Sequence, residues 1–285
     1  MNFSRITLLL LLILSFFFGC TALKDFASIQ KPKISVADFQ VSDVSLRDIE
    51  LTFDIQIDNP NAISLNLDSY NFDFLVNKNS FVKGNQPLVT EIKPNASSVL
   101  QIPVSFSYED LFGSFTSLRQ NDEVEYDFTS IIAVDIPVLG LTEIPIEKSG
   151  VFPVVKLPRI SASNLNVKNI SFSKAELELE LNIDNPNSFS LDLSDLNYNI
   201  DINGLKSVSG AISKKIDLSA KENNSFQLPI TFNLIELGRG AYQILRSKEP
   251  VEYSITGSSN IDTSLPYFNA SDFDFERSGS LKIFN

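Results

Sequence analysis

The feature that most constrains this chain of 285 residues is that it carries its sequence pattern twice. A shift of 126 residues superimposes residues 32–111 on residues 158–237 without a gap, and Asp58-Asn59-Pro60-Asn61 falls on Asp184-Asn185-Pro186-Asn187. Other matched pairs are Pro32 and Pro158, Ser64 and Ser190, Leu65 and Leu191, Leu67 and Leu193, Gly84 and Gly210, and Phe106 and Phe232. Beyond residue 237 the offset drifts by a few residues, and the match resumes near the C-terminus. The repeat predicts two domains of ordinary size in tandem.

Proline residues and the repeat together set the expected domain boundaries. We expect a first domain over residues 32–156 and a second over residues 157–285. The prolines at 153 and 158 punctuate a short, stiff connection between the two domains. Residues 20–31 are expected to be a tether that leads into the first domain.

Apolar and polar residues alternate with a period of two in each half. The apolar members of the clearest run are Leu51, Phe53, Ile55 and Ile57 in the first half, and Leu177, Leu179, Leu181 and Ile183 in the second. Such alternation is typical of an antiparallel strand with one face in the core and one face in water. Further short strands are expected at residues 65–67, 71–76, 99–106, 125–134 and 143–147, with turn residues between them.

One short helix is expected in each half. Ser107 and Asn233 are the candidate N-caps, and Asp110 and Glu236 follow three residues later, near the positive end of each helix. In the first half the apolar residues at helical spacing are Leu111, Phe112, Phe115 and Leu118. The sequence therefore predicts an all-β fold: two tandem antiparallel β-sandwiches, each with one short helix.

The repeated pattern resembles the water-stress-and-hypersensitive-response (WHy) domain of the late embryogenesis abundant type 2 family. The resemblance rests on an alternating strand that ends in Asn-Pro-Asn, then a Ser-Leu-x-Leu strand, an aromatic strand that ends near an asparagine, and a strand closed by glycine. Ser117-Leu118-Arg119 and Ile244-Leu245-Arg246 match the end of the family's helix. The resemblance covers each half once. It implies an immunoglobulin- or fibronectin-III-like sandwich, an association with desiccation and other stress, and no enzymatic chemistry.

One turn of the family pattern differs between the halves. Asn203-Gly204 keeps the family's hairpin turn in the second half, whereas Asn77-Lys78 replaces it in the first. Because a two-residue hairpin favours glycine at the second turn position, we expect the first-half hairpin to be looser or longer.

The N-terminal residues predict export and a lipid anchor. An apolar run from Leu8 to Phe18 follows Arg5 and ends at Gly19 and Cys20, the only cysteine. The run is shorter than the about 20 apolar residues that a spanning helix needs, and it is typical of a signal peptide over residues 1–19. A small residue before cysteine resembles the lipobox of bacterial lipoproteins, in which the cysteine is lipidated. The resemblance implies lipidation at Cys20 and a location in the bacterial cell envelope; the alternative is an ordinary signal peptide with an incidental cysteine. A threonine rather than aspartate after Cys20 favours the outer membrane over the inner.

The Asn-Pro-Asn motifs have a structural interpretation first. Proline cannot donate to a strand ladder, and asparagine bonds local backbone and tolerates left-handed geometry. We therefore expect Asn59, Pro60 and Asn61, and likewise Asn185, Pro186 and Asn187, to end strands as structural turns. The alternative is a polar loop for water, protein or an ion, with Asp58 and Asp184 offering oxygens to calcium. A dense Asp-x-Asp run with a glycine pivot, as in a calcium loop, does not occur, so no metal site is expected.

Composition argues against several functions. The formal net charge of −12 argues against binding to nucleic acid and against electrostatic adhesion to anionic headgroups. The chain has no histidine, so the commonest general base is missing. It has one cysteine, which excludes zinc–thiolate sites with several cysteine ligands. No glycine-rich phosphate loop occurs. We therefore expect no enzymatic activity and no cofactor.

Two functions remain. The first is a non-catalytic, lipid-anchored envelope protein that protects its neighbours under desiccation and stress. Its expected partners are the membrane, reached through acyl chains on Cys20, other envelope proteins and stress-labile client proteins. The alternative is an envelope or surface binding module for a protein, glycan or lipid ligand, in which the many phenylalanines line a lipid groove instead of packing in a core.

Overall fold

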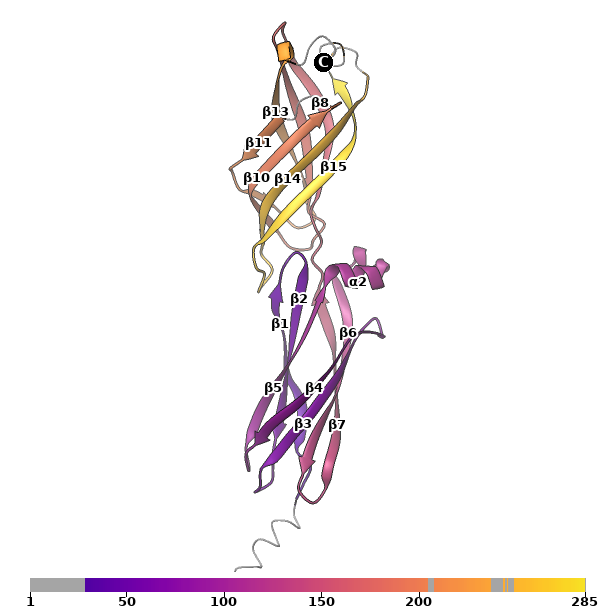
Figure 1. Cartoon of the computed structure of the whole chain (residues 1–285), viewed down its shortest axis with the longest axis vertical. Coiled ribbons are helices and arrows are strands. Elements are labelled where there is room, and N and C mark those ends of the chain that lie inside the picture. Colours follow the sequence, from indigo (N-terminus) through magenta and orange to yellow (C-terminus); the bar gives the residue numbers. More distant parts are fainter. Residues whose placement is uncertain (1–28, 205–207, 237–242, 244, 246–248, 285) are drawn as a thin grey trace, which may run out of the picture. The chain divides into compact units, whose positions relative to one another are not determined.

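A computed structural model describes residues 29–204, 208–236, 243, 245 and 249–284 (Figure 1). Contacts along the chain divide it into two compact units. Unit 1 contains the described residues up to Ser42 together with residues 50–106 and 123–152. Unit 2 contains residues 43–49, residues 107–122 and the described residues from Pro153 onward. Two short segments of the first sequence repeat therefore belong to the same compact unit as the second repeat.

The strands of the first repeat form two sheets. The three-stranded sheet has the order β1-β2-β5, and the four-stranded sheet has the order β4-β3-β6-β7. Their bounds are β1 (Lys33–Val44), β2 (Asp48–Asp58), β5 (Ser97–Ser107), β4 (Asn79–Ile92), β3 (Leu65–Val76), β6 (Glu123–Ile136) and β7 (Gly140–Pro153). The apolar residues of the β2 alternation are buried in the core between the two sheets. There the Phe53 ring stacks on the Phe128 ring of β6, with a centroid separation of 3.9 Å.

Glycine and aromatic residues pair across neighbouring strands at matched positions of both repeats. Gly84 lies opposite Phe72 on β3, and Gly210 lies opposite Tyr198 in the second repeat. A Cβ atom on Gly84 would lie 2.1 Å from Cε1 of Phe72, and one on Gly210 would lie 2.3 Å from the Tyr198 ring. The aromatic ring thus covers the glycine backbone, which explains why a glycine stands near this point of each repeat.

The strands of the second repeat join into one eight-stranded sheet. Its order is β11-β10-β14-β15-β8-β9-β13, and β12 pairs with β10. The bounds are β8 (Arg159–Ile170), β9 (Lys174–Asp184), β10 (Leu191–Ile202), β11 (Val208–Ile212), β12 (Ile216–Leu218), β13 (Asn223–Asn233), β14 (Val251–Thr263) and β15 (Ser271–Phe284). β15 pairs antiparallel with β14 over residues 271–281, and its residues 282–284 then pair in parallel with β8. The end of β15 thereby connects the two halves of a sandwich.

The first-half helix begins where the sequence predicts and ends earlier. α2 (Tyr108–Ser114) is capped by the Ser107 side chain, whose Oγ accepts a hydrogen bond from the Asp110 backbone N–H at 3.0 Å. At Phe115 the backbone leaves the helical region, with φ −133° and ψ 73°, so the residues after it form a separate 3-10 helix, η1 (Thr116–Gln120). Leu111 and Leu118 are buried as expected. In the second half residues 234–236 are helical and follow the Asn233 cap, and most of the expected helix beyond them lies outside the described residues.

The expected break between strands at 65–67 and 71–76 is wrong. Both segments belong to β3, which continues through residues 68–70 with a shift of register between Leu67 and Ser69. β3 pairs with β4 on one side and with β6 on the other, and both pairings continue beyond the register shift.

The prediction of a looser or longer hairpin at Asn77-Lys78 is also wrong. Val76 pairs with Asn79, so only two residues form the turn. Asn77 and Lys78 have φ of 48° and 64°, close to 50° and 68° at Asn203 and Gly204. Lys78 therefore adopts the left-handed geometry that a type I′ turn requires, although a side chain there costs about 1–2 kcal/mol of backbone strain.

Within the described part of the chain, no helix combines the length and the apolar character needed to cross a membrane. The apolar run from Leu8 to Phe18 and the predicted lipidation site, Cys20, lie outside the described residues.

Candidate functional site at the Asn-Pro-Asn turns

The Asn-Pro-Asn motifs follow directly on the ends of two matched strands. β2 ends at Asp58 and β9 ends at Asp184. The asparagines of both motifs are buried: Asn59 and Asn61 are 2% and 5% exposed, and Asn185 and Asn187 are 0% exposed. Because a buried amide must be hydrogen-bonded to avoid a desolvation cost, the contacts of these side chains determine what the motif can do.

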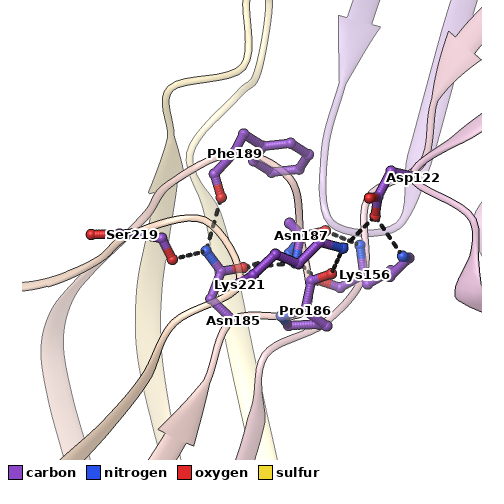
Figure 2. A network of polar contacts seen from close by, with 8 residues as sticks. All are labelled: Asp122, Lys156, Asn185, Pro186, Asn187, Phe189, Ser219 and Lys221. Carbon is purple, nitrogen blue, oxygen red and sulfur yellow. Dashed lines mark hydrogen bonds and ion pairs between the residues drawn. The ribbon is translucent and has the colours of Figure 1, made fainter.

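Asn185 holds together three strands' ends in unit 2. Its Nδ2 donates hydrogen bonds to the carbonyl oxygens of Phe189 at 2.8 Å and Ser219 at 2.9 Å (Figure 2). It also contacts the Leu218 carbonyl oxygen at 3.3 Å. Its Oδ1 accepts from the backbone N–H and from Nδ2 of Asn187, at 3.0 and 3.1 Å. One buried amide thus fixes the turn before β10 to the turn after β12.

Asn187 holds the segment that enters the second repeat. Its Oδ1 accepts a hydrogen bond from the Lys156 backbone N–H, and its Nδ2 donates to the Lys156 carbonyl oxygen, both at 2.8 Å. The side-chain amide therefore imitates one residue of a neighbouring strand. Asn61 makes the same pair of contacts with Gln30 in unit 1, at 2.8 and 2.9 Å.

The geometry of the first motif repeats that of the second. Asn59 Nδ2 donates to the carbonyl oxygens of Ile63, Ile92 and Lys93 at 2.8, 3.3 and 3.0 Å. Its Oδ1 accepts from the backbone N–H and from Nδ2 of Asn61, each at 3.0 Å. In both units the amides are consumed by the protein's own backbone, so the motif acts as an internal lock and presents no open polar loop.

The aspartates before the motifs are held by neighbouring side chains. Asp58 accepts hydrogen bonds from Ser97 Oγ at 2.5 Å and Gln56 Nε2 at 2.9 Å, and these bonds lower the pKa of the Asp58 carboxyl. Asp184 lies 3.7 Å from the Arg159 guanidinium. Across the residues that the structure describes, no group of three carboxylate, histidine or cysteine side chains is placed to hold a metal ion.

A trio of charged residues that the sequence does not predict lies beside the second motif. The Asp122 carboxylate lies 2.6 Å from Lys221 Nζ and 2.9 Å from Lys156 Nζ, all within unit 2 (Figure 2). Lys221 Nζ also donates to the Pro186 carbonyl oxygen at 2.8 Å. The Lys221 and Lys156 hydrogen bonds hold the pKa of Asp122 below its ordinary value. These residues are far apart in the sequence, and no local pattern links them.

Unit 1 carries an open groove with a volume of about 1000 Å³. It crosses β4, β3, β6 and β7, and Lys83 and Asp73 form an ion pair of 3.3 Å among its lining residues. Asn71, Asn85, Thr129 and Glu147 also line it. The volume falls within the range of small-molecule sites. Of the phenylalanines that the alternative prediction places in a lipid groove, Phe74 and Phe106 are buried core residues, whereas Phe72 lines this groove.

A family of known proteins matches each of the two repeats separately. The model of the late embryogenesis abundant protein family matches residues 54–150 and 180–279. The late embryogenesis abundant protein Lea14-A of Gossypium hirsutum is 25% identical over 135 residues, which is 47% of this chain and 87% of the relative. The desiccation-related protein PCC27-45 of Craterostigma plantagineum is 26% identical over 135 residues, with the same coverage of 47% and 87%. A solution structure from Arabidopsis thaliana, 26% identical, covers 46% of this chain and 86% of its own, with a TM-score of 0.38. Each relative thus has about the length of one repeat.

Proposed function

Because the chain belongs to the late embryogenesis abundant type 2 family, we propose that it protects neighbouring molecules when water is withdrawn, and that it does so without catalysis. The observation that carries the proposal is the family match in both repeats, together with a relative, PCC27-45, that is named as desiccation-related. A protective role requires a scaffold that stays folded while its surroundings dry. The buried Asn-Pro-Asn locks support such a role, since they close the strand ends with the protein's own hydrogen bonds instead of water.

The surface supports protection by dispersal. The formal net charge of the chain is −12. A high net charge of one sign keeps proteins apart in solution. We propose that the chain separates stress-labile client proteins through excluded volume, charge repulsion and weak polar contacts.

We further propose that acyl chains on Cys20 hold the protein at the bacterial envelope, with the outer membrane as the favoured location. The supporting observations are the apolar run, the Gly19-Cys20 pair and the position of the first locked residue. Asn61 fixes Gln30, ten residues after Cys20, and ten extended residues reach at most about 35 Å. An anchor at Cys20 would therefore keep unit 1 close to the membrane surface.

The test expresses the full chain and its Cys20→Ser variant in a bacterial host. Intact-mass analysis and membrane fractionation report the anchor, and viable counts after drying report protection. We expect the wild-type chain to carry acyl groups, to sediment with membranes and to raise survival above that of cells with an empty vector. A soluble, unacylated wild-type chain would contradict the anchor, and survival equal to the empty vector would contradict protection.

The groove of unit 1 favours a second candidate, a binding module for a small polar ligand such as an oligosaccharide. Lys83, Asp73 and Asn85 supply a charge pair and an amide to the groove. Isothermal titration of the chain with a panel of oligosaccharides tests this candidate, with Lys83→Ala as the variant. Saturable binding that the variant abolishes would support it, and the absence of binding to the whole panel would refute it.

A further inference from the structure

The hairpin that joins β6 and β7 exposes apolar side chains at its tip. Val138, Leu139 and Leu141 are 76%, 50% and 62% exposed. From Ile136 to Thr142 the chain has no charged residue. Single exposed apolar residues are ordinary, but a run of three on one tip marks a surface that another apolar phase covers.

The backbone of this tip is strained at Val138, which has a positive φ. The Leu139 backbone N–H donates to the Ile136 carbonyl oxygen at 3.0 Å, which defines a tight turn with Pro137 and Val138 at its centre. Val138 has φ of 75°, a conformation that the third residue of such turns usually meets with glycine. A β-branched residue with positive φ is an outlier, and such strain clusters at functional sites. Since glycine would suit the turn better, the valine side chain serves something other than the turn.

Unit 2 contains the same turn with its backbone bonded to another segment, while the Tyr267 side chain stays 63% exposed. There the Phe268 backbone N–H bonds to the Leu265 carbonyl oxygen at 3.4 Å, and Tyr267, like Val138, has positive φ, at 63°. Within unit 2, Val44 donates its N–H to the Tyr267 carbonyl oxygen at 3.1 Å and accepts from the Asn269 N–H at 2.8 Å. Among the residues that the structure describes, no backbone hydrogen bond from another segment reaches Pro137 or Val138 in this way.

Strand pairing places the Val138 turn at the end of unit 1 where the chain enters from Cys20. The last residues of β6 pair with the first residues of β3, with Asp135 opposite Asn66. β3 follows the Asn-Pro-Asn turn in which Asn61 holds Gln30. The β6–β7 hairpin accordingly lies beside the start of β1 (Figure 1). Two more exposed valines, Val89 and Val99, lie near the facing ends of β4 and β5 at this same end.

We propose that the tip formed by Val138, Leu139 and Leu141 inserts into the lipid surface that holds Cys20. The inference rests on the proposed lipid anchor, because the anchor determines which phase lies within reach of this end of unit 1. Inserted apolar side chains leave water for the boundary between headgroups and acyl chains. The hairpin then acts as a second membrane contact, which orients unit 1 on the surface instead of leaving it on a free tether.

Site-specific fluorescence on the full, acylated chain tests the proposal. An environment-sensitive maleimide dye is attached at Leu139→Cys or at Leu141→Cys, and the matched control carries it at Lys78→Cys. Lys78 lies in the hairpin at the far end of β3, and an acylated Cys20 has a thioether sulfur that does not react with the dye. The protein is placed in vesicles of phosphatidylethanolamine and phosphatidylglycerol, with spin-labelled lipid as the quencher and intact-mass analysis to verify the acyl groups.

We expect spin-labelled lipid to lower the emission at 139 and 141 by about twofold or more, as for a side chain 5–10 Å deep, and to leave the emission at 78 unchanged. If acyl groups are present and the dyes at 139 and 141 are not quenched, the hairpin proposal is overturned while the anchor stands. A blue shift at 139 without lipid quenching would mean that protein covers the tip, which also overturns it. If Cys20 carries no acyl group and the chain stays off the vesicles, the anchor fails and the inference fails with it.

Discussion

Replacing the first asparagine of either motif is the sharpest test of the internal lock. Asn185→Ala removes the two N–H donors that serve three carbonyl oxygens, and two accepted hydrogen bonds, from a side chain that is 0% exposed. A buried hydrogen bond contributes about 1 kcal/mol net, and a buried group left unsatisfied costs about 1–3 kcal/mol, so we expect a loss of about 3–4 kcal/mol. Asn185→Asp keeps the shape but points a carboxylate oxygen at the three carbonyl oxygens. At neutral pH it should cost more than alanine, and the excess should shrink as the carboxyl is protonated.

Amide hydrogen exchange followed by mass spectrometry on the full chain measures this loss separately in each unit. Asn185→Ala should accelerate exchange in the peptides that contain the start of β10 and the end of β12. Asn59→Ala should do so in those that contain the start of β3 and the end of β4. Pro60→Ala, in the same turn but exposed, is the control, and it should cost at most about 1 kcal/mol through the entropy of the unfolded chain. A loss below about 1 kcal/mol for Asn185→Ala, or a milder effect of aspartate than of alanine at neutral pH, would refute the reasoning.

Three further perturbations test other parts of the account. Gly84→Ala should lower stability by about 1–3 kcal/mol because its Cβ would overlap the Phe72 ring, whereas Gly113→Ala in open space should gain up to about 1 kcal/mol; thermal unfolding of both variants checks the contrast. Lys78→Gly should stabilise by about 0.5–1 kcal/mol in urea unfolding, since it removes left-handed strain but loosens the unfolded chain, and an unchanged midpoint would contradict the strained turn. Asp122→Asn should cost about 1 kcal/mol at pH 7, as its carboxylate is partly exposed. Because the folded state lowers the pKa of Asp122, its contribution is complete above the ordinary carboxyl pKa and is lost as pH falls through the lowered value; a difference between wild type and variant that persists at pH 2 would contradict this assignment.

Much of the fold was predictable because the sequence repeats and alternates. The runs that contain Phe53 and Leu179 specify half-buried strands on their own, and the second copy of each run removes chance as an explanation. The Ser107 cap was also predictable, since a hydroxyl just before an apolar helical run accepts a hydrogen bond from a free backbone N–H of the first turn. The family match reached across both repeats through these same positions.

The deviations arise where tertiary pairing overrides local preference. Lys78 accepts positive φ because the β3–β4 ladder fixes the turn length, and no local rule for lysine predicts that. The sequence predicted a helix through Phe115, but the backbone departs there and restarts as a 3-10 turn. The trio of Asp122, Lys156 and Lys221 depends on spatial neighbours that a linear pattern does not contain. The Asn-Pro-Asn motif lies between these cases: its place at a strand end was predictable, while its carbonyl partners on other strands were not.

Drying a labile enzyme together with vesicles that carry the acylated full chain tests the central claim most directly. Protein-free vesicles with an equal mass of albumin are the reference, and the activity retained after rehydration is measured. The account predicts that the enzyme retains more activity beside the anchored chain than beside albumin. Retained activity equal to that of the albumin reference would contradict a protective function.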